Sequence, residues 1–70
     1  MNRLMTFVIQ HEENGGWVLR EGGCSLPLGR YPHRETLKEI GAFVAAKRRP
    51  SVLVVQRRDG STLVRRSFRE

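Results

Sequence analysis

The chain has 70 residues, of which 39% are hydrophobic and 29% are charged, and its formal net charge is +6. A chain this short buries only about 60% of the surface that it exposes when unfolded, which leaves no core for a second domain or a deep catalytic pocket. We therefore expect one soluble domain over residues 1–70 that is not an enzyme and holds no cofactor.

Glycine turns separate the strands predicted near the start of the chain. Apolar and polar side chains alternate over residues 3–11, which is typical of a strand with one better-buried face. Asn14-Gly15-Gly16 then turns the chain into a second strand at Trp17–Arg20. A three-residue loop with a glycine bulge places Trp17 and Leu19 on the apolar face of the first strand, so we favour it over a two-residue turn.

A third extended segment, Ser25-Leu26-Pro27-Leu28, forms either a short strand or an ordered loop. Because proline donates no backbone hydrogen bond, Pro27 restricts a strand here to the edge of the sheet. Pro32 closes the extended region, and the next residues begin a different pattern.

One helix is predicted over residues 33–49. Its apolar stripe comprises Leu37, Ile40, Val44 and, at the margin, Phe43. Gly41 lies on the same stripe, which indicates that the helix backbone approaches a strand closely. Lys47-Arg48-Arg49 suits the negative end of the helix dipole, which is a sufficient structural reason for that triplet, and Pro50 ends the helix.

The last third of the chain predicts a β-hairpin. Two β-branched runs, 52–55 and 62–64, flank Asp59-Gly60, a strong hairpin signal. A two-residue turn there sets Val55 opposite Val64 and Leu53 opposite Arg66. Leu63, Arg65, Ser67 and Arg69 then point away from the helix. The predicted architecture is of the α+β class, a small β-β-(β)-α-β-β domain with one mostly antiparallel sheet and one helix packed on one face.

Three features of the chain carry a resemblance to a known family. They are Gly15-Gly16-Trp17-Val18, Tyr31 before the helix, and the segment from Val54 to Gly60 leading to Arg66-Ser67-Phe68. On these residues the chain resembles a family of small bacterial and phage proteins known as domain of unknown function 2188. The likeness covers most of the chain. The sequence departs from the family at Cys24 to Arg30 and at the helix start. The resemblance implies a compact fold and no known activity.

A second likeness rests on Phe7-Val8-Ile9, Gly15-Gly16-Trp17 and Cys24. These residues are similar to the start of the pattern of the HicB-type antitoxins. The Gly-Cys-to-Gly-x-Thr spacing before their helix is missing, and the Asp59-Gly60 hairpin fits poorly. This likeness would imply a protein-binding role.

The residues that could carry catalysis or bind a metal are few. Cys24, His11 and His33 show neither C-x-x-C nor H-x-x-x-H spacing, so we expect no catalytic and no metal site. Trp17, the single tryptophan, is expected in the core rather than stacked on a base.

The cysteine count and the length of the apolar stretches indicate where the protein is located. As the only cysteine, Cys24 cannot form a disulfide within the chain, which fits a reducing compartment. No stretch approaches the ~20 apolar residues of a membrane span, and the run from Leu4 to Ile9 is too short for a secretory signal. We expect a cytoplasmic protein without a membrane partner.

The positive charge is concentrated at one end of the chain. Residues 47–70 hold the whole excess of +6, whereas residues 1–46 have no net charge. Such a region attracts polyanions, of which nucleic acid is the commonest, and arginine suits bidentate contact with phosphate. We therefore predict a DNA- or RNA-binding surface formed by Arg48, Arg49, Arg57, Arg58, Arg65 and Arg69.

The alternative is a protein-interaction module, in particular a self-associating homodimer. Exposed sheet edges in so small a domain invite pairing with another chain. The apolar residues assigned to such contacts are Leu26, Leu28 and Leu63. Binding of a polyanion weakens steeply with salt and apolar docking does not, so ionic strength separates the two hypotheses.

Overall fold

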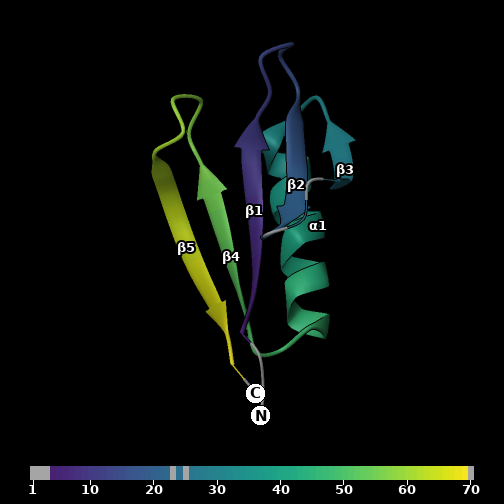
Figure 1. Cartoon of the computed structure of the whole chain (residues 1–70), viewed down its shortest axis with the longest axis vertical. Coiled ribbons are helices and arrows are strands. Elements are labelled where there is room, and N and C mark those ends of the chain that lie inside the picture. Colours follow the sequence, from purple (N-terminus) through teal and green to yellow (C-terminus); the bar gives the residue numbers. More distant parts are fainter. Residues whose placement is uncertain (1–3, 23, 25, 70) are drawn as a thin grey trace.

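The computed structural model describes residues 4–22, 24 and 26–69, which form one helix and a five-stranded sheet (Figure 1). In chain order the elements are β1 (Met5–His11), β2 (Trp17–Glu21), β3 (Pro27–Tyr31), α1 (Arg34–Lys47), β4 (Ser51–Gln56) and β5 (Thr62–Phe68). The strand order is β3-β2-β1-β4-β5, and α1 covers one face. The predicted α+β class and element order are therefore confirmed.

The sheet is mixed because the helix reverses the direction of the chain. β1 pairs antiparallel with β2, β2 with β3, and β4 with β5. α1 then carries the chain back along the sheet, so β4 begins at the same end as β1 and pairs parallel with it. The central strand, β1, thus lies beside β4, which is far from it in the sequence.

The β1–β2 and β4–β5 hairpins each close through a three-residue loop with a glycine at positive φ. In the first, the N–H of Glu12 donates to the carbonyl of Gly16 over 2.8 Å, and Gly15 has a φ of 98°. His11 therefore lies opposite Trp17, as the predicted bulge requires. Trp17 is buried in the core, as predicted.

The two-residue turn predicted at Asp59-Gly60 is wrong. The N–H of Arg57 donates to the carbonyl of Ser61 over 2.8 Å, so the loop holds three residues, and Gly60 has a φ of 90°. An irregularity in the β4–β5 pairing takes up the extra residue. The register then returns to the predicted one, with Val55 opposite Val64, and Leu63 becomes the residue without a partner.

The third strand lies later in the chain than predicted. β3 runs over Pro27–Tyr31 rather than over residues 25–28, of which Ser25 lies outside the described residues. Because Tyr31 pairs with Trp17, β3 extends as far as the first residue of β2. Pro27 is the first residue of this edge strand, where a missing N–H costs no ladder bond.

The core lies between α1 and the sheet. Its buried members are Phe7, Ile9, Trp17, Leu19, Leu37, Ala45, Leu53, Val55 and Phe68. Gly41 is buried as well. The packing against it is tight, since a Cβ at this position would lie only 3.0 Å from Cδ1 of Leu53. This close approach was predicted.

Phe43 does not belong to the helix stripe, contrary to the prediction. Its side chain is 64% exposed. The helix approaches the sheet along Leu37, Gly41 and Ala45, where two small residues allow close packing. At about 100° per residue, Phe43 lies on the side of the helix opposite to Gly41.

The last strand is left without a covering layer. α1 packs against β1, β2, β3 and β4. Residues 62–67 of β5 are all exposed, and Phe68 is the one buried residue of this strand.

α1 has 14 residues, and no helix in the described part of the chain is long and apolar enough to cross a membrane.

Candidate nucleic-acid interface

The arginines predicted to bind nucleic acid lie along β5 and at both of its ends. In chain order they are Arg48 and Arg49 in the α1–β4 connection, Arg57 and Arg58 in the β4–β5 loop, Arg65 in β5, and Arg69 directly after it. All six are exposed. The seven residues of β5 span about 23 Å. We call this surface the arginine edge.

One end of the arginine edge is built by two segments that are distant in the sequence. Nη1 of Arg49 donates to the carbonyl oxygen of Arg69 over 2.8 Å, and Nε of Arg49 donates to that of Ala46 over 3.1 Å. The Arg49 guanidinium also lies 5.8 Å from the ring centroid of Phe68. These contacts connect the C-terminal end of α1 to the end of β5.

Arg66 joins the same end of the edge, although the sequence analysis did not include it among the binding residues. Its guanidinium lies 4.8 Å from the Phe68 ring, so Phe68 contacts two arginines. The predicted register already placed Arg66 opposite Leu53, two residues before Phe68, and that position was the available signal.

At the hairpin tip, Arg57 and Arg58 differ in role. Nη1 of Arg57 donates to the carbonyl oxygen of Thr62 over 2.7 Å and to Oγ of Ser61 over 3.2 Å. Arg57 is therefore engaged in holding the loop closed. The Arg58 side chain makes no hydrogen bond or ion pair with any described residue and is the one at this tip that can contact a ligand without disturbing the fold.

Asp59 is the acidic residue of this loop, and its carboxylate is used within the loop. Oδ1 of Asp59 accepts the Ser61 hydroxyl at 2.6 Å and the Ser61 N–H at 2.9 Å. These two bonds, the hydroxyl first, lower the pKa of Asp59 below its ordinary value, and the charge of Arg57 lowers it further. No carboxylate of the described residues pairs with Arg58, Arg65 or Arg69.

Arg65 also belongs to the sheet face that α1 leaves open. On this face, one row across four strands reads Arg20, Val8, Val54, Arg65. Three strand spacings separate the two arginines, or about 14 Å. Arg30, in β3, is by contrast paired with Glu12, since Nε lies 3.1 Å from the carboxylate.

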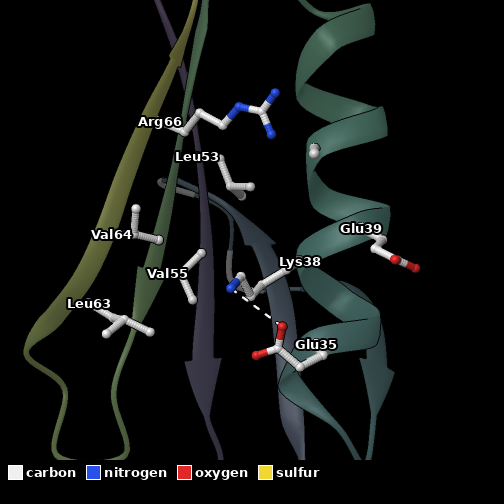
Figure 2. A pocket seen from close by; sticks show the side chains of 9 residues that line it. Glu35, Lys38, Glu39, Leu53, Val55, Leu63, Val64 and Arg66 are labelled. Carbon is white, nitrogen blue, oxygen red and sulfur yellow. Dashed lines mark ion pairs between the residues drawn. The ribbon is translucent and has the colours of Figure 1, made fainter.

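The leucines predicted to mediate protein contacts do not form one surface. Leu26 and Leu28 lie just before and within β3, at one edge of the sheet, and Leu63 lies in β5 at the opposite edge. Leu63 was predicted to point away from the helix. Because it is the unpartnered residue of the bulge, it instead lines a groove on the helix side, next to Val64 (Figure 2).

The residues considered for catalysis or metal binding are dispersed. Cys24 is exposed, and His33 is the residue preceding the helix, where its side chain makes no capping bond. His11 packs edge-on against Trp17, with ring centroids 4.9 Å apart. Among residues 4–22, 24 and 26–69, no three His, Cys, Asp or Glu side chains are grouped so as to hold a metal ion.

Comparison with known proteins gives one match. Residues 6–68 match the model of the family DUF2188, which is described as "uncharacterized protein conserved in bacteria". No curated protein and no solved structure matches the chain significantly. The match spans all five strands and the helix apart from the first residue of β1.

Proposed function

Since the chain belongs to the DUF2188 family, whose description names no activity, we propose from geometry and charge that it is a non-enzymatic module that binds nucleic acid through the phosphate backbone. The arginine edge is the binding surface. The observation that carries this proposal is that Arg58 in the β4–β5 loop, Arg65 in β5 and Arg69 directly after β5 are exposed and unpaired with any described carboxylate. A row of unneutralised guanidinium groups attracts a polyanion and can contact successive phosphates.

The bonds within the edge divide its residues into two groups. Arg49 and Arg57 donate to backbone carbonyls and stabilise the fold at the two ends of β5. The other four arginines are available to phosphate, namely Arg48, Arg58, Arg65 and Arg69. Phosphate contacts fix position and carry no sequence information. The module therefore binds duplex DNA and duplex RNA of unrelated sequence with similar affinity.

The test compares two double variants that lose the same charge. Arg58→Gln/Arg65→Gln removes two unpaired arginines from the edge, and Arg30→Gln/Lys38→Gln removes two basic residues that pair with Glu12 and Glu35 elsewhere. Binding to a fluorescent 20-base-pair duplex is measured by anisotropy over a range of salt concentrations. We expect the first variant to bind at least tenfold more weakly at low salt, with a log–log salt slope reduced by about 1.8, and the second to bind like the wild type.

Two results would overturn the proposal. One is a wild-type protein that binds neither duplex at low salt. The other is equal weakening by the two double variants, which would show that net charge alone, and not the arginine edge, governs the affinity. Thermal melting by circular dichroism verifies that each variant remains folded.

A further inference from the structure

One helix is too narrow to cover this sheet. An α-helix with its side chains is about 10 Å wide, and five strands at about 4.8 Å spacing extend over about 19 Å. α1 covers β1 to β4, and the helix-side residues of β5 other than the buried Phe68 remain in solvent. Leu63 and Val64 are 37% and 42% exposed although both are apolar. The layer above β4 and β5 is therefore incomplete.

A groove of about 690 Å³ occupies this position (Figure 2). Leu53, Val55, Leu63 and Val64 line it from the sheet, and Ala42 lines it from α1. The two ends of the groove differ in charge. The Glu35–Lys38 ion pair, at 3.4 Å, lies at the end where α1 begins, and Arg66 reaches over the other end from β5. Glu39 lies one turn after Glu35, with its carboxylate directed away from the sheet.

The charges along α1 follow the same order as those of the groove, acidic first and basic last. Its first half holds Glu35 and Glu39, and its last turn and the next residues hold Lys47-Arg48-Arg49. The helix side that borders the groove presents Glu35, Lys38, Glu39 and Ala42. Ala46 follows in the series Glu35, Glu39, Ala42, Ala46, whose members are four, three and four residues apart. Such spacing places these residues on one stripe of a helix. Its two alanines permit close approach of a second helix.

We propose that the occupant of the groove is α1 of a second copy of this chain, lying antiparallel to the first, so that two copies form a symmetric dimer. In this arrangement the acidic first half of the second helix lies at the Arg66 end of the groove. The basic end of that helix lies beside Glu35 of the first copy. The two-fold axis passes near Ala42, and each contact occurs twice.

Charge and burial both favour this pairing. Glu39 of each copy meets Arg66 of the other, and the antiparallel helix dipoles add to the attraction. Ala42 and Ala46 of one copy cover the exposed Leu63 and Val64 of the other. The alternative self-association through the free edge of β5 places Arg65 and Arg66 next to the same residues of the second copy, and this like-charge contact opposes it.

The dimer shares Arg66 and the basic end of α1 with the arginine edge, and it is tested apart from the proposed binding of nucleic acid. It uses the helix side of the sheet, whereas Arg65 lies on the open face. The apolar area in the groove is small for an interface, so we expect a weak dimer whose mass depends on concentration. Self-association is therefore measured without nucleic acid present, and either proposal can fail alone.

The test is a charge exchange followed by sedimentation equilibrium over micromolar to near-millimolar concentrations. We expect the wild type to shift from monomer to dimer, and Arg66→Glu and Glu39→Arg each to dimerise at least tenfold more weakly. An equimolar mixture of the two variants restores both ion pairs in a heterodimer, which native mass spectrometry identifies. Arg65→Glu, on the open face, is the matched control and dimerises like the wild type.

The two exchanged residues are exposed, and thermal melting verifies that Arg66→Glu, which removes the guanidinium from the Phe68 ring, remains folded. A wild type that stays monomeric at every concentration overturns the proposal. So does a pair of single variants that dimerise like the wild type, or a mixture that fails to form the heterodimer. The last result would mean that the groove accepts a helix other than an antiparallel copy of α1.

Discussion

Ser51 donates its hydroxyl to the carbonyl oxygen of Ala45 over 2.6 Å, in a buried position between the last turn of α1 and the start of β4. The last carbonyls of a helix have no partner within the helix, and water cannot reach this one. The same oxygen also accepts the N–H of Arg48 at 3.0 Å. The bond to Ser51 thus sets where the helix ends relative to the sheet, and with it the place of Arg48 and Arg49.

Ser51→Ala is expected to lower the free energy of unfolding by about 1 kcal/mol, because the buried carbonyl loses one donor and keeps the other. Urea denaturation followed by tryptophan fluorescence measures the change. Ser67→Ala is the control, since Ser67 lies in β5 and is exposed. We expect that control to differ from the wild type by less than about 0.5 kcal/mol. Equal stability of the two variants would contradict a role for the Ser51 hydroxyl.

Gly41→Ala is expected to destabilise the protein although alanine is the better helix former. The new Cβ would lie 3.0 Å from Cδ1 of Leu53 and 3.3 Å from Cδ1 of Ile9, both of them buried. Overpacking of a core costs about 1–3 kcal/mol, against a gain of about 1 kcal/mol in helix propensity. The net loss expected in urea denaturation is about 1 kcal/mol.

Two further variants identify the cause of that loss. Thr36→Ala, at an exposed helix position, is expected to raise stability by a few tenths of a kcal/mol, as propensity alone dictates. Leu53→Val shortens the side chain that Gly41→Ala would press against. The double variant Gly41→Ala/Leu53→Val is therefore expected to lose less stability than the sum of the losses of Gly41→Ala and Leu53→Val. Strict additivity would show that Leu53 does not limit the space at Gly41.

The β4–β5 loop is expected to weaken in acid through Asp59. Hydrogen bonds from Ser61 lower the pKa of Asp59 in the folded protein. A lowered pKa means that the carboxylate stabilises the fold at pH above the ordinary value, and that this contribution is lost as the pH falls through the lowered value. NMR titration of Asp59 should give a midpoint below that of an unstructured aspartate. Ser61→Ala should raise that midpoint, and an unchanged one would refute the assignment.

Local sequence patterns determined most of the secondary structure. Alternation of apolar and polar residues identified β1, and glycines that adopt positive φ located both hairpins. The pairing of His11 with Trp17 and of Val55 with Val64 followed from the same signals. These features depend on residues close together in the chain, so they are accessible without the fold. The concentration of arginine after residue 46 is likewise a property of the sequence alone.

The errors arose where a local signal had two nearly equivalent outcomes. Asp59-Gly60 suits a two-residue turn, but the chain adopts a three-residue loop and compensates with a bulge at Leu63. That bulge, formed against β4, moved Leu63 from the open face to the groove. Phe43 was predicted at the margin of the helix stripe. The close packing of Gly41 and Ala45 against the sheet decided that it lies outside.

Only the tertiary structure decided how the charged and apolar residues combine. Return of the chain through α1 sets β4 parallel to β1 and brings Arg49 to Arg69 and Arg66 to the same end. It also leaves β5 beyond the reach of the single helix, which creates the groove. The bond between Arg49 and Arg69 joins residues 20 positions apart, and the β1–β4 pairing joins Met5 to Ser51. Their formation depends on how the whole sheet is ordered, a choice that no short stretch of sequence encodes.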